Sequence, residues 1–406
     1  MTSFIVATSD TVRSINRRII LDLIRTRQPV SRADLARLSG LQRSTISLIT
    51  EQLLTEKWIT QGALGHLPRG RKPRFLHLNV ERAGIVGINV RPTNTTIALA
   101  NLNAQFIAHE SFPTNADADV FIEDLTRRLQ AFIKLYPDVY FEGIGVSMPG
   151  RVDSISKKLV FAPNLGWRDV DLQTPLERAT GLLVEIENAA NACALAEIWF
   201  DRRSDGIQDL IAVTVSEGIG TGIITNGQLL RGVNGLAGEF GHVSINESGP
   251  LCKCGNRGCW EVYASNTAAI NEYVQVTPSN NSKKQNNRFN ESYSIERDKP
   301  SFDDILYLSE QGDTRAIETI ERMGYYLGVG LSMLISGMAP SMIVLIGEVT
   351  RAWKRIEPII KDVLGKRVQP SSLKTRIVPS EDNLQPRLRG SMALILQKHF
   401  GAPLTA

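Results

Sequence analysis

The chain has 406 residues, of which 42% are apolar and 22% are charged, as is typical of a soluble globular protein with two or three domains. No apolar run reaches the roughly 18 residues of a membrane helix, and the first ten residues lack the features of a signal peptide, so we expect a cytoplasmic protein without membrane insertion. Residues 1–80 carry 13 Lys and Arg against 5 Asp and Glu, a net charge of +8, whereas the whole chain carries only +4. The basic segment alone is therefore expected to bind a polyanion.

The basic segment opens with a predicted helix over residues 12–25, where isoleucine and leucine recur at helical spacing. Ser31, with an acidic residue three positions later, is the predicted N-cap of a short helix that ends at Leu38. Gly40 predicts a tight turn before a third helix over about residues 42–56. This order predicts a helix-turn-helix. Its recognition helix would present to the major groove the side chains of Arg43, Ser44, Thr45 and Ser47.

A basic strip over residues 68–74 follows at the place where a winged helix has its wing. Its centre, Arg69-Gly70-Arg71, is extended and has no bulk at the glycine, so both arginines can point into a narrow A·T-rich minor groove. The alternative is a solvated basic linker, since basic runs are common in tails. We interpret residues 1–80 as a winged helix-turn-helix domain whose partner is DNA.

From residue 81 to residue 406, strands alternate with helices in a two-lobed α/β pattern. The predicted elements are a hairpin over 85–90 and 95–102, a helix over 120–135, a buried strand over 143–147, strands over 210–215 and 222–225, and a late buried strand over 342–346. The pattern resembles the actin-like ATPase fold, with a cleft between its lobes. Residues 278–291, rich in Asn, Ser and Lys, are expected to form a flexible surface insertion.

Three cysteines and a histidine form the densest group of candidate metal ligands: Cys252, Cys254 and Cys259, with His242 ten positions upstream of the first. Neighbouring sulfur atoms in such a run point apart and do not easily form disulfides, whereas three thiolates and one imidazole can surround one tetrahedral zinc ion. Four protein ligands leave no open position for water, so we expect one structural zinc per chain. The alternative is a group of buried cysteines in a reduced protein.

Two carboxylates, Glu239 and Glu261, lie on either side of this run. Paired carboxylates beside a fixed imidazole suit hydrogen bonding to the hydroxyls of a sugar. If one nitrogen of His242 binds zinc, the other becomes a donor of fixed tautomer. The alternative is that both glutamates are solvated loop residues.

The segment Ala-Gly-Glu-Phe-Gly-His, which ends at His242, and the segment Cys-x-Cys-Gly-x-x-Gly-Cys-x-Glu, which ends at Glu261, resemble the signature of the ROK family (repressor, open reading frame, kinase). Further motifs occur in the family's order over residues 147–153, 162–167, 187–191 and 218–222. The resemblance implies either a sugar kinase or a sugar-responsive repressor, so the fold alone does not decide the function. It also implies that the sugar is contacted by Asn164, Asn188, Glu239, His242 and Glu261.

The kinase parts of this pattern are altered. Where kinases of the family have an aspartate as base, this chain has Ala189, and losing a general base typically costs about 10² to 10⁴ in rate. The first phosphate loop, Asp-x-Gly-Gly-Thr in the kinases, has become Asn89-Val-Arg91-Pro92-Thr, in which proline has no amide for phosphate. A late glycine turn is interrupted by Glu348, which would repel phosphate.

Because the sugar-facing positions persist while the catalytic ones are lost, we expect sugar binding without turnover. The resemblance therefore favours a sugar-responsive transcriptional regulator, a repressor rather than an enzyme, that acts on operator DNA as a homodimer or higher homo-oligomer. One alternative is an active ROK sugar kinase with an accessory DNA-binding head. Another is a regulator whose effector is a protein partner docked on the body.

Overall fold

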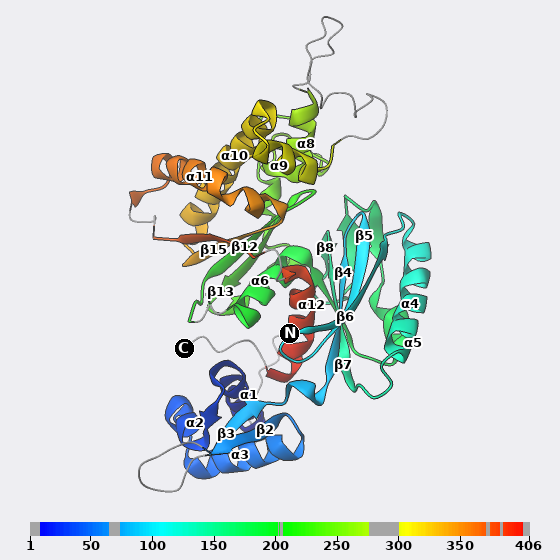
Figure 1. Ribbon diagram of the computed structural model, residues 1–406, viewed down its shortest axis with the longest axis vertical. Coiled ribbons are helices and arrows are strands. Elements are labelled where there is room, and N and C mark those ends of the chain that lie inside the picture. The colour runs from blue at the N-terminus through cyan, green and yellow to red at the C-terminus, as the bar shows by residue number, and fades with distance from the viewer. Residues whose placement is uncertain are drawn as a thin grey trace, which may run out of the picture.

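A computed structural model of the chain describes residues 9–64, 74–201, 203, 206–275, 300–370, 374–381 and 385–400. A small N-terminal domain, here called the head, lies below a body of two lobes (Figure 1). Each lobe contains a five-stranded sheet, and two helices, α6 (Ala189–Phe200) and α12 (Pro386–Phe400), lie between the two sheets. The predicted two-lobed α/β architecture is therefore confirmed.

The head contains three helices and a three-stranded antiparallel sheet in the order β1-β3-β2. Its elements are α1 (Ser9–Arg27), β1 (Val30–Ser31), α2 (Arg32–Ser39), α3 (Arg43–Thr55), β2 (Ile59–Leu64) and β3 (Arg74–Leu78). Ser31 forms a capping box with Asp34 at the start of α2, and Gly40 ends that helix with φ at +70°. Three helices followed by a hairpin are the elements that the winged helix-turn-helix prediction requires, and the assignment itself stays a prediction.

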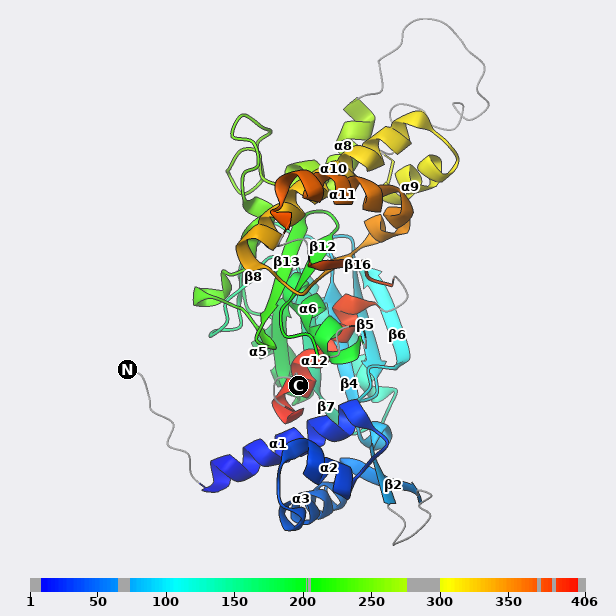
Figure 2. The ribbon, with the colours of Figure 1, turned by 90° about the vertical axis from the view of Figure 1, so that its left-hand side faces the viewer.

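The hydrophobic core of the head continues into the body. Trp58, which follows α3, packs against Phe400 at the end of α12, with ring centroids 5.7 Å apart. Arg25 of α1 lies over the ring of Trp199 of α6 and donates a hydrogen bond to the backbone oxygen of Trp199 at 2.9 Å. The head therefore packs against the lower ends of α6 and α12, and Figure 2 shows α1 directly beneath them.

Lobe 1 is built on a mixed sheet in the order β11-β7-β4-β5-β6. Its elements are η1 (Val80–Arg82), β4 (Gly84–Val90), β5 (Asn94–Ala100), β6 (Phe106–Pro113), α4 (Ala118–Lys134), β7 (Phe141–Met148), β8 (Arg151–Val152), β9 (Leu159–Ala162), β10 (Trp167–Val170), α5 (Gln173–Thr180) and β11 (Val184–Asn188). Helices α4 and α5 cover the outer face of the sheet, and α12 covers the inner face (Figure 1). Strand β4 is buried along almost its whole length because helices cover both faces.

Lobe 2 is built on a second mixed sheet in the order β14-β13-β12-β15-β16. Its elements are β12 (Leu210–Val215), β13 (Ile219–Thr225), β14 (Gln228–Leu229), η3 (Val233–Gly235), η4 (Glu239–His242), α7 (Glu261–Ala264), α8 (Asn266–Gln275), α9 (Phe302–Glu310), α10 (Thr314–Met338), β15 (Met342–Ile346), η5 (Glu348–Ala352), α11 (Trp353–Arg367) and β16 (Arg376–Pro379). Helices α8 to α11 lie on the outer side of this sheet (Figure 1).

Helix α12 is held closely against lobe 1. A Cβ atom at Gly145 of β7 would lie 1.8 Å from the backbone oxygen of Ser391, so the helix can approach the strand only because that residue is glycine. On its other side, α12 packs along α6, which in turn contacts β12 and β13 of lobe 2. The two helices are therefore the layer through which the lobes meet.

The predicted strands and helices of the body are all present. The hairpin corresponds to β4 and β5, the amphipathic helix to α4, and the buried strands to β7, β12, β13 and β15. The first helix of the head begins at Ser9 and ends at Arg27, slightly beyond its predicted range. The insertion predicted over residues 278–291 lies outside the described residues. Within the described part of the chain, no helix is long and apolar enough to span a membrane.

Candidate functional site

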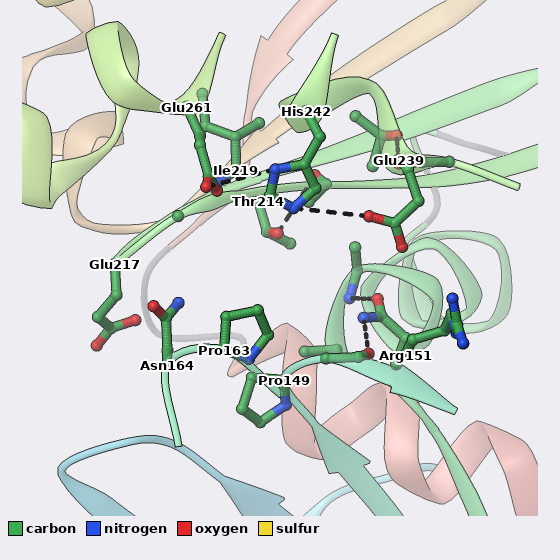
Figure 3. A pocket seen from close by; sticks show the side chains of 18 of the residues that line it. Pro149, Arg151, Pro163, Asn164, Thr214, Glu217, Ile219, Glu239, His242 and Glu261 are labelled. Atoms are coloured by element: carbon green, nitrogen blue, oxygen red, sulfur yellow. Dashed lines mark hydrogen bonds and ion pairs between the residues drawn. The ribbon is translucent and has the colours of Figure 1, made fainter. Parts of the chain in front are cut away.

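A cavity of about 390 Å³ lies between the two lobes. Figure 3 shows Glu261, His242 and Glu239 in a row on the lobe 2 wall and Asn164 on the facing lobe 1 wall. Polar groups from both lobes thus converge on the cavity, as recognition of a hydroxyl-rich ligand requires. The structure brings together all five residues implied for sugar binding: Asn164, Asn188, Glu239, His242 and Glu261.

The imidazole of His242 lies between the two glutamates. Its Nδ1 is 3.5 Å from Glu261 Oε1, and its Nε2 is 3.8 Å from Glu239 Oε2. The Glu261 side chain is 17% exposed and accepts a hydrogen bond from the backbone N–H of Ile219 at 3.4 Å, whereas the Glu239 side chain is 49% exposed. Glu261 is therefore held by the protein, and Glu239 is the more accessible of the two carboxylates.

Gly218 makes room for the Glu261 carboxylate. A Cβ atom at residue 218 would lie only 2.7 Å from Glu261 Oε2, which is closer than real Cβ contacts allow. This glycine belongs to the motif over residues 218–222, and its place in the structure is the wall of the cavity beside Glu261. Because residue 218 has no side chain, the Glu261 carboxylate can occupy its place in the cavity wall.

The four predicted metal ligands form one cluster, with their ligand atoms all within 4.8 Å of one another. Cys252 Sγ lies 3.7 Å from His242 Nδ1, and Cys254 Sγ lies 3.6 Å from Cys259 Sγ. In a tetrahedral zinc site with Zn–S bonds of about 2.3 Å, neighbouring ligand atoms are about 3.7 Å apart. The three cysteines and the histidine therefore fit one metal ion, with Nδ1 as the nitrogen that faces it.

Burial changes the acidity of a thiol in this cluster. It raises the pKa of Cys259 to about 11, with the neighbouring Cys254 adding to the effect. A metal ion that binds at neutral pH must therefore displace the proton of this thiol. The arrangement predicts metal affinity that rises with pH.

Trp260 anchors the cysteine loop to lobe 2. Its ring is fully buried, and its Nε1–H donates a hydrogen bond to the backbone oxygen of Tyr326 in α10 at 2.8 Å. The backbone N–H of Trp260 donates to the oxygen of Val243 at 2.9 Å, which ties the loop to the segment that carries His242. The loop therefore fixes Glu261 and His242 relative to each other and to α10.

A family model described as the ROK family matches residues 85–398 of this chain. The chain belongs to the ROK family. It is 30% identical over 393 residues to the xylose repressor of Bacillus spizizenii, with 96% of each chain covered. It is also 30% identical over 361 residues to the DNA-binding transcriptional dual regulator NagC of Escherichia coli (strain K12), with 88% of this chain and 86% of NagC covered.

Solved structures confirm the fold of this ROK protein. A ROK family transcriptional regulator, a homolog of the E. coli MLC protein, superposes with a TM-score of 0.80 at 24% identity and covers 96% of this chain and 98% of its own. A ROK family glucokinase from Streptomyces griseus, in complex with glucose and AMPPNP, gives a TM-score of 0.67 at 27% identity and covers 78% of this chain and 100% of its own. The match to the regulator thus extends over more of this chain than the match to the kinase.

Residue 189, which the resemblance equates with the base of the family's kinases, is an alanine in this chain. Ala189 is the first residue of α6, and Asn188 caps that helix by accepting a hydrogen bond from the backbone N–H of Ala190 at 2.8 Å. The neighbouring carboxylate of Glu187 accepts hydrogen bonds from Arg231 Nε at 3.0 Å and from Asn191 Nδ2 at 3.0 Å. Glu187 is therefore already paired, and no carboxylate replaces the missing aspartate at the start of α6.

The structure also qualifies the roles of the two asparagines. Besides capping α6, Asn188 donates through Nδ2 to the backbone oxygen of Gly150 at 2.7 Å, so its contact with sugar stays a prediction. Asn164 Oδ1 accepts a hydrogen bond from Lys253 Nζ at 3.3 Å. Lys253 was missed by the sequence reasoning, although its place between two cysteines of the metal loop could have drawn attention to it.

Arg91, in the altered first loop, and Glu348, in the altered glycine turn, form an ion pair. Arg91 Nη2 lies 3.0 Å from Glu348 Oε1 and 3.2 Å from Oε1 of Glu217, a residue that sequence reasoning missed. Burial opposes the positive charge of Arg91, but the two carboxylates outweigh it and raise the pKa of the guanidinium. The two segments that were predicted to have lost phosphate binding are thus joined by an ion pair.

The predicted recognition helix presents a mainly polar surface to solvent. Arg43, Ser44 and Ser47 are exposed and Thr45 is half-buried, while Ile46, Ile49, Thr50 and Leu53 face the core. Leu48 lies among the exposed residues with 72% of its surface accessible. Arg69, Gly70 and Arg71 lie outside the described residues, in the sequence between β2 and β3.

Proposed function

We propose that this ROK protein is a sugar-responsive transcriptional repressor that binds a sugar between its lobes without phosphorylating it. The observation that carries the proposal is the asymmetry of the cavity, which retains Glu239, His242 and Glu261 but has Ala189 at the position of the base. Carboxylates accept hydrogen bonds from hydroxyls, whereas a methyl group cannot remove a hydroxyl proton. A sugar would therefore bind and leave unchanged, as an effector does.

The relatives support this reading. Two relatives are named as a xylose repressor and as a transcriptional dual regulator, and their matches cover 96% and 88% of this chain, which is more than the body alone. The ROK family glucokinase covers 78% of this chain, a smaller share than the 96% that the transcriptional regulator covers. By this comparison xylose and N-acetylglucosamine are the first sugars to test, the latter because other relatives are named N-acetylglucosamine repressors.

In this proposal, His242, Cys252, Cys254 and Cys259 hold one structural zinc ion. The ion supplies a cross-link between η4 and the cysteine loop, and its four protein ligands leave no open position for water. Because His242 Nδ1 faces the sulfur atoms, the Nε2–H remains on the side of Glu239, where it can donate to a sugar hydroxyl.

The head would bind operator DNA through the exposed face of α3 in the major groove. A homodimer would present two such heads to a two-fold symmetric operator, and a sugar that favours one arrangement of the lobes would change how the heads are placed. In this scheme the protein acts in the cytoplasm. A protein partner as effector is the alternative if no sugar binds.

The proposal can be tested with purified full-length protein. D-xylose, N-acetylglucosamine, D-glucose and their phosphates are screened by thermal unfolding, since a ligand at 100 times its Kd adds about 2.7 kcal/mol of stability. Each stabilising sugar is then incubated with the protein, ATP and Mg²⁺ to look for phosphorylation. In a second assay, the same sugar is added to the protein bound to DNA duplexes that were selected from a random library. We expect no phosphorylated product and a sugar-dependent change in DNA affinity. ATP-dependent phosphorylation of a stabilising sugar would establish the kinase alternative instead.

A further inference from the structure

Arg91 links the two lobes at the base of the cleft. Arg91 follows β4 of lobe 1. Its partners belong to lobe 2: Glu217 lies in the loop between β12 and β13, and Glu348 is the first residue of η5. A single guanidinium nitrogen, Nη2, lies within 3.2 Å of one oxygen of each carboxylate. One side chain of lobe 1 thus engages two separate loops of lobe 2.

Helix α8 holds the carboxylate of Glu348 and the backbone of Glu217. Glu348 Oε2 accepts a hydrogen bond from Asn266 Nδ2 at 3.0 Å, and the backbone oxygen of Glu217 accepts one from Thr267 Oγ1 at 2.8 Å. The side chains of Arg91, Glu217 and Glu348 are only 27 to 30% exposed, so solvent screens their attraction less than at an open surface. The receptor for Arg91 is therefore preformed in lobe 2.

A second arginine completes the cluster. Arg387, in the first turn of α12, donates a hydrogen bond to Ser216 Oγ at 2.9 Å. Burial raises the pKa of Glu217 and Glu348, but the positive charges of Arg91 and Arg387 outweigh it and lower the pKa of both carboxyl groups. Within this cluster, the two positive charges of Arg91 and Arg387 balance the two negative charges of Glu217 and Glu348. The cluster leaves no surplus positive charge with which to hold a polyphosphate.

We propose that Arg91 is a positioning residue that holds the two lobes closed around the sugar cavity, in the place where a kinase of this fold has nucleotide phosphate. Arg91 and Glu217 line the same cavity as Asn164 of lobe 1 and Glu261 of lobe 2, so the ion pairs set the distance between the two walls. The cavity is thereby formed without a nucleotide. This inference rests on the proposed function and extends it, since a regulator that binds sugar without a nucleotide still needs the two cavity walls held at a fixed distance.

The proposal is tested by measuring the distance between the lobes in the full chain, without sugar or DNA. Spin labels are carried by genetically encoded ketone amino acids, so that the cysteine cluster stays intact. One label replaces Leu135 at the end of α4, and the other replaces Lys361 of α11, positions whose residues are 70% and 72% exposed. Pulsed electron double resonance then gives the distribution of distances between them.

We expect the wild type to give one narrow distribution and Arg91→Ala to give a longer and broader one, with the open population raised about five- to tenfold. Glu348→Gln keeps the shape of the side chain but removes its charge, and should shift the distribution in the same direction even if Arg91→Ala folds poorly. In the Arg91→Ala background, Glu348→Gln should add nothing further, because the pair is already broken.

Arg128→Ala is the matched control. Arg128 also bridges two carboxylates, Glu110 at 2.6 Å and Asp124 at 2.8 Å, but both belong to lobe 1. Its removal should leave the distance distribution unchanged. An unchanged distribution in both Arg91→Ala and Glu348→Gln, or an equal change in Arg128→Ala, would overturn the proposal. Because neither sugar nor DNA is present, this result is separate from failure of the repressor function, which the phosphorylation and DNA assays detect.

Discussion

Trp58 of the head packs edge-on against Phe400, the last residue of α12, with their ring planes at 89°. At the opposite end of the same helix, Arg387 lines the cavity between the lobes and donates a hydrogen bond to Ser216. A helix of 15 residues is about 22 Å long, so one rigid element connects the cavity with the head. A ligand that moves α12 would therefore displace the surface on which the head rests.

This connection predicts that Phe400→Leu uncouples the head from the cavity. The smaller side chain loses the aromatic contact with Trp58 but keeps most of the apolar volume, so the fold should persist at a cost of about 1 kcal/mol. DNA affinity without sugar and sugar affinity without DNA should both remain close to wild type, while the effect of sugar on DNA affinity should shrink. Fluorescence anisotropy of a labelled duplex, with and without sugar, measures this effect.

Phe132→Leu provides the control for this experiment. Phe132 lies buried in α4 of lobe 1, away from α12, so the same substitution there should leave the sugar response intact. A full sugar response in Phe400→Leu would show that the signal reaches the head by another route.

The metal cluster predicts that Cys254→Ser loses both zinc and stability, because three ligands and a poorly donating hydroxyl hold the ion weakly. Cys193→Ser is the matched control, since Cys193 is the fourth cysteine and lies buried in α6 outside the cluster. Elemental analysis should find about one zinc per chain in the wild type and in the control. Stoichiometric zinc in the Cys254→Ser protein would contradict this ligand set.

Much of this structure could be predicted from local sequence. The Ser31 capping box, the glycine turn at Gly40 and the alternation of strands and helices each depend on neighbouring residues, and the structure contains them. The metal cluster was predictable because three of its four ligands lie within eight residues.

Contacts between distant residues could not be predicted in this way. Arg91 and Glu348 are 257 positions apart, and only the closure of the two lobes brings their charges together. The packing of Trp58 against Phe400 likewise depends on how the chain returns from its C-terminus to its head. The charge or size of each of these residues is evident from the sequence, but the residue that it contacts is not.

The head should bind DNA in two modes. Arg43→Ala should lower affinity for a selected duplex by about 1–3 kcal/mol and relax its sequence specificity, because an arginine at the start of a recognition helix reads a base edge. A double Arg69→Ala and Arg71→Ala variant should instead lose the preference for A·T-rich flanks, whose minor groove is narrow.

Competition binding with A·T and G·C flanks separates the two modes. Arg127→Ala, in the exposed part of α4, removes the same charge from the body and should change neither property. Equal sensitivity to the flanks in the wild type and in the double variant would mean that the basic strip is only a charged linker.

Glu197 predicts a pH dependence of stability. Burial in α6 and the hydrogen bond with Asp201 raise its pKa to about 8, against the opposing charges of Arg203 and Arg389. The folded chain therefore holds a proton that the unfolded chain, with a pKa near 4.5, has released. This contribution is fully present below about pH 4.5 and is lost as the pH rises toward 8.

In the Glu197→Gln variant the side chain stays uncharged throughout this range, so the variant should not show the loss of stability with rising pH. Urea unfolding of the wild type and the variant at several values between pH 5 and pH 8 measures the difference in free energy of unfolding, which should move in favour of the variant as the pH rises. A constant difference across this range would show that Glu197 is ionised in the folded chain.

The central claim is that the carboxylates beside His242 sense the sugar. Glu239→Ala and Glu261→Ala leave hydroxyl groups of the bound sugar unpaired, which should cost about 1–3 kcal/mol of affinity, whereas neither residue belongs to the head. Glu247→Ala is the control, because Glu247 is an exposed glutamate of the same segment that does not line the cavity.

The most direct measurement is the DNA affinity of these variants with and without the sugar that stabilises the wild type. We expect all three variants to bind DNA as the wild type does in the absence of sugar. When sugar is added, Glu239→Ala and Glu261→Ala should no longer respond, while Glu247→Ala should respond fully. A response equal to that of the wild type in both Glu239→Ala and Glu261→Ala would contradict the account, because the cavity would then not be the sensing site.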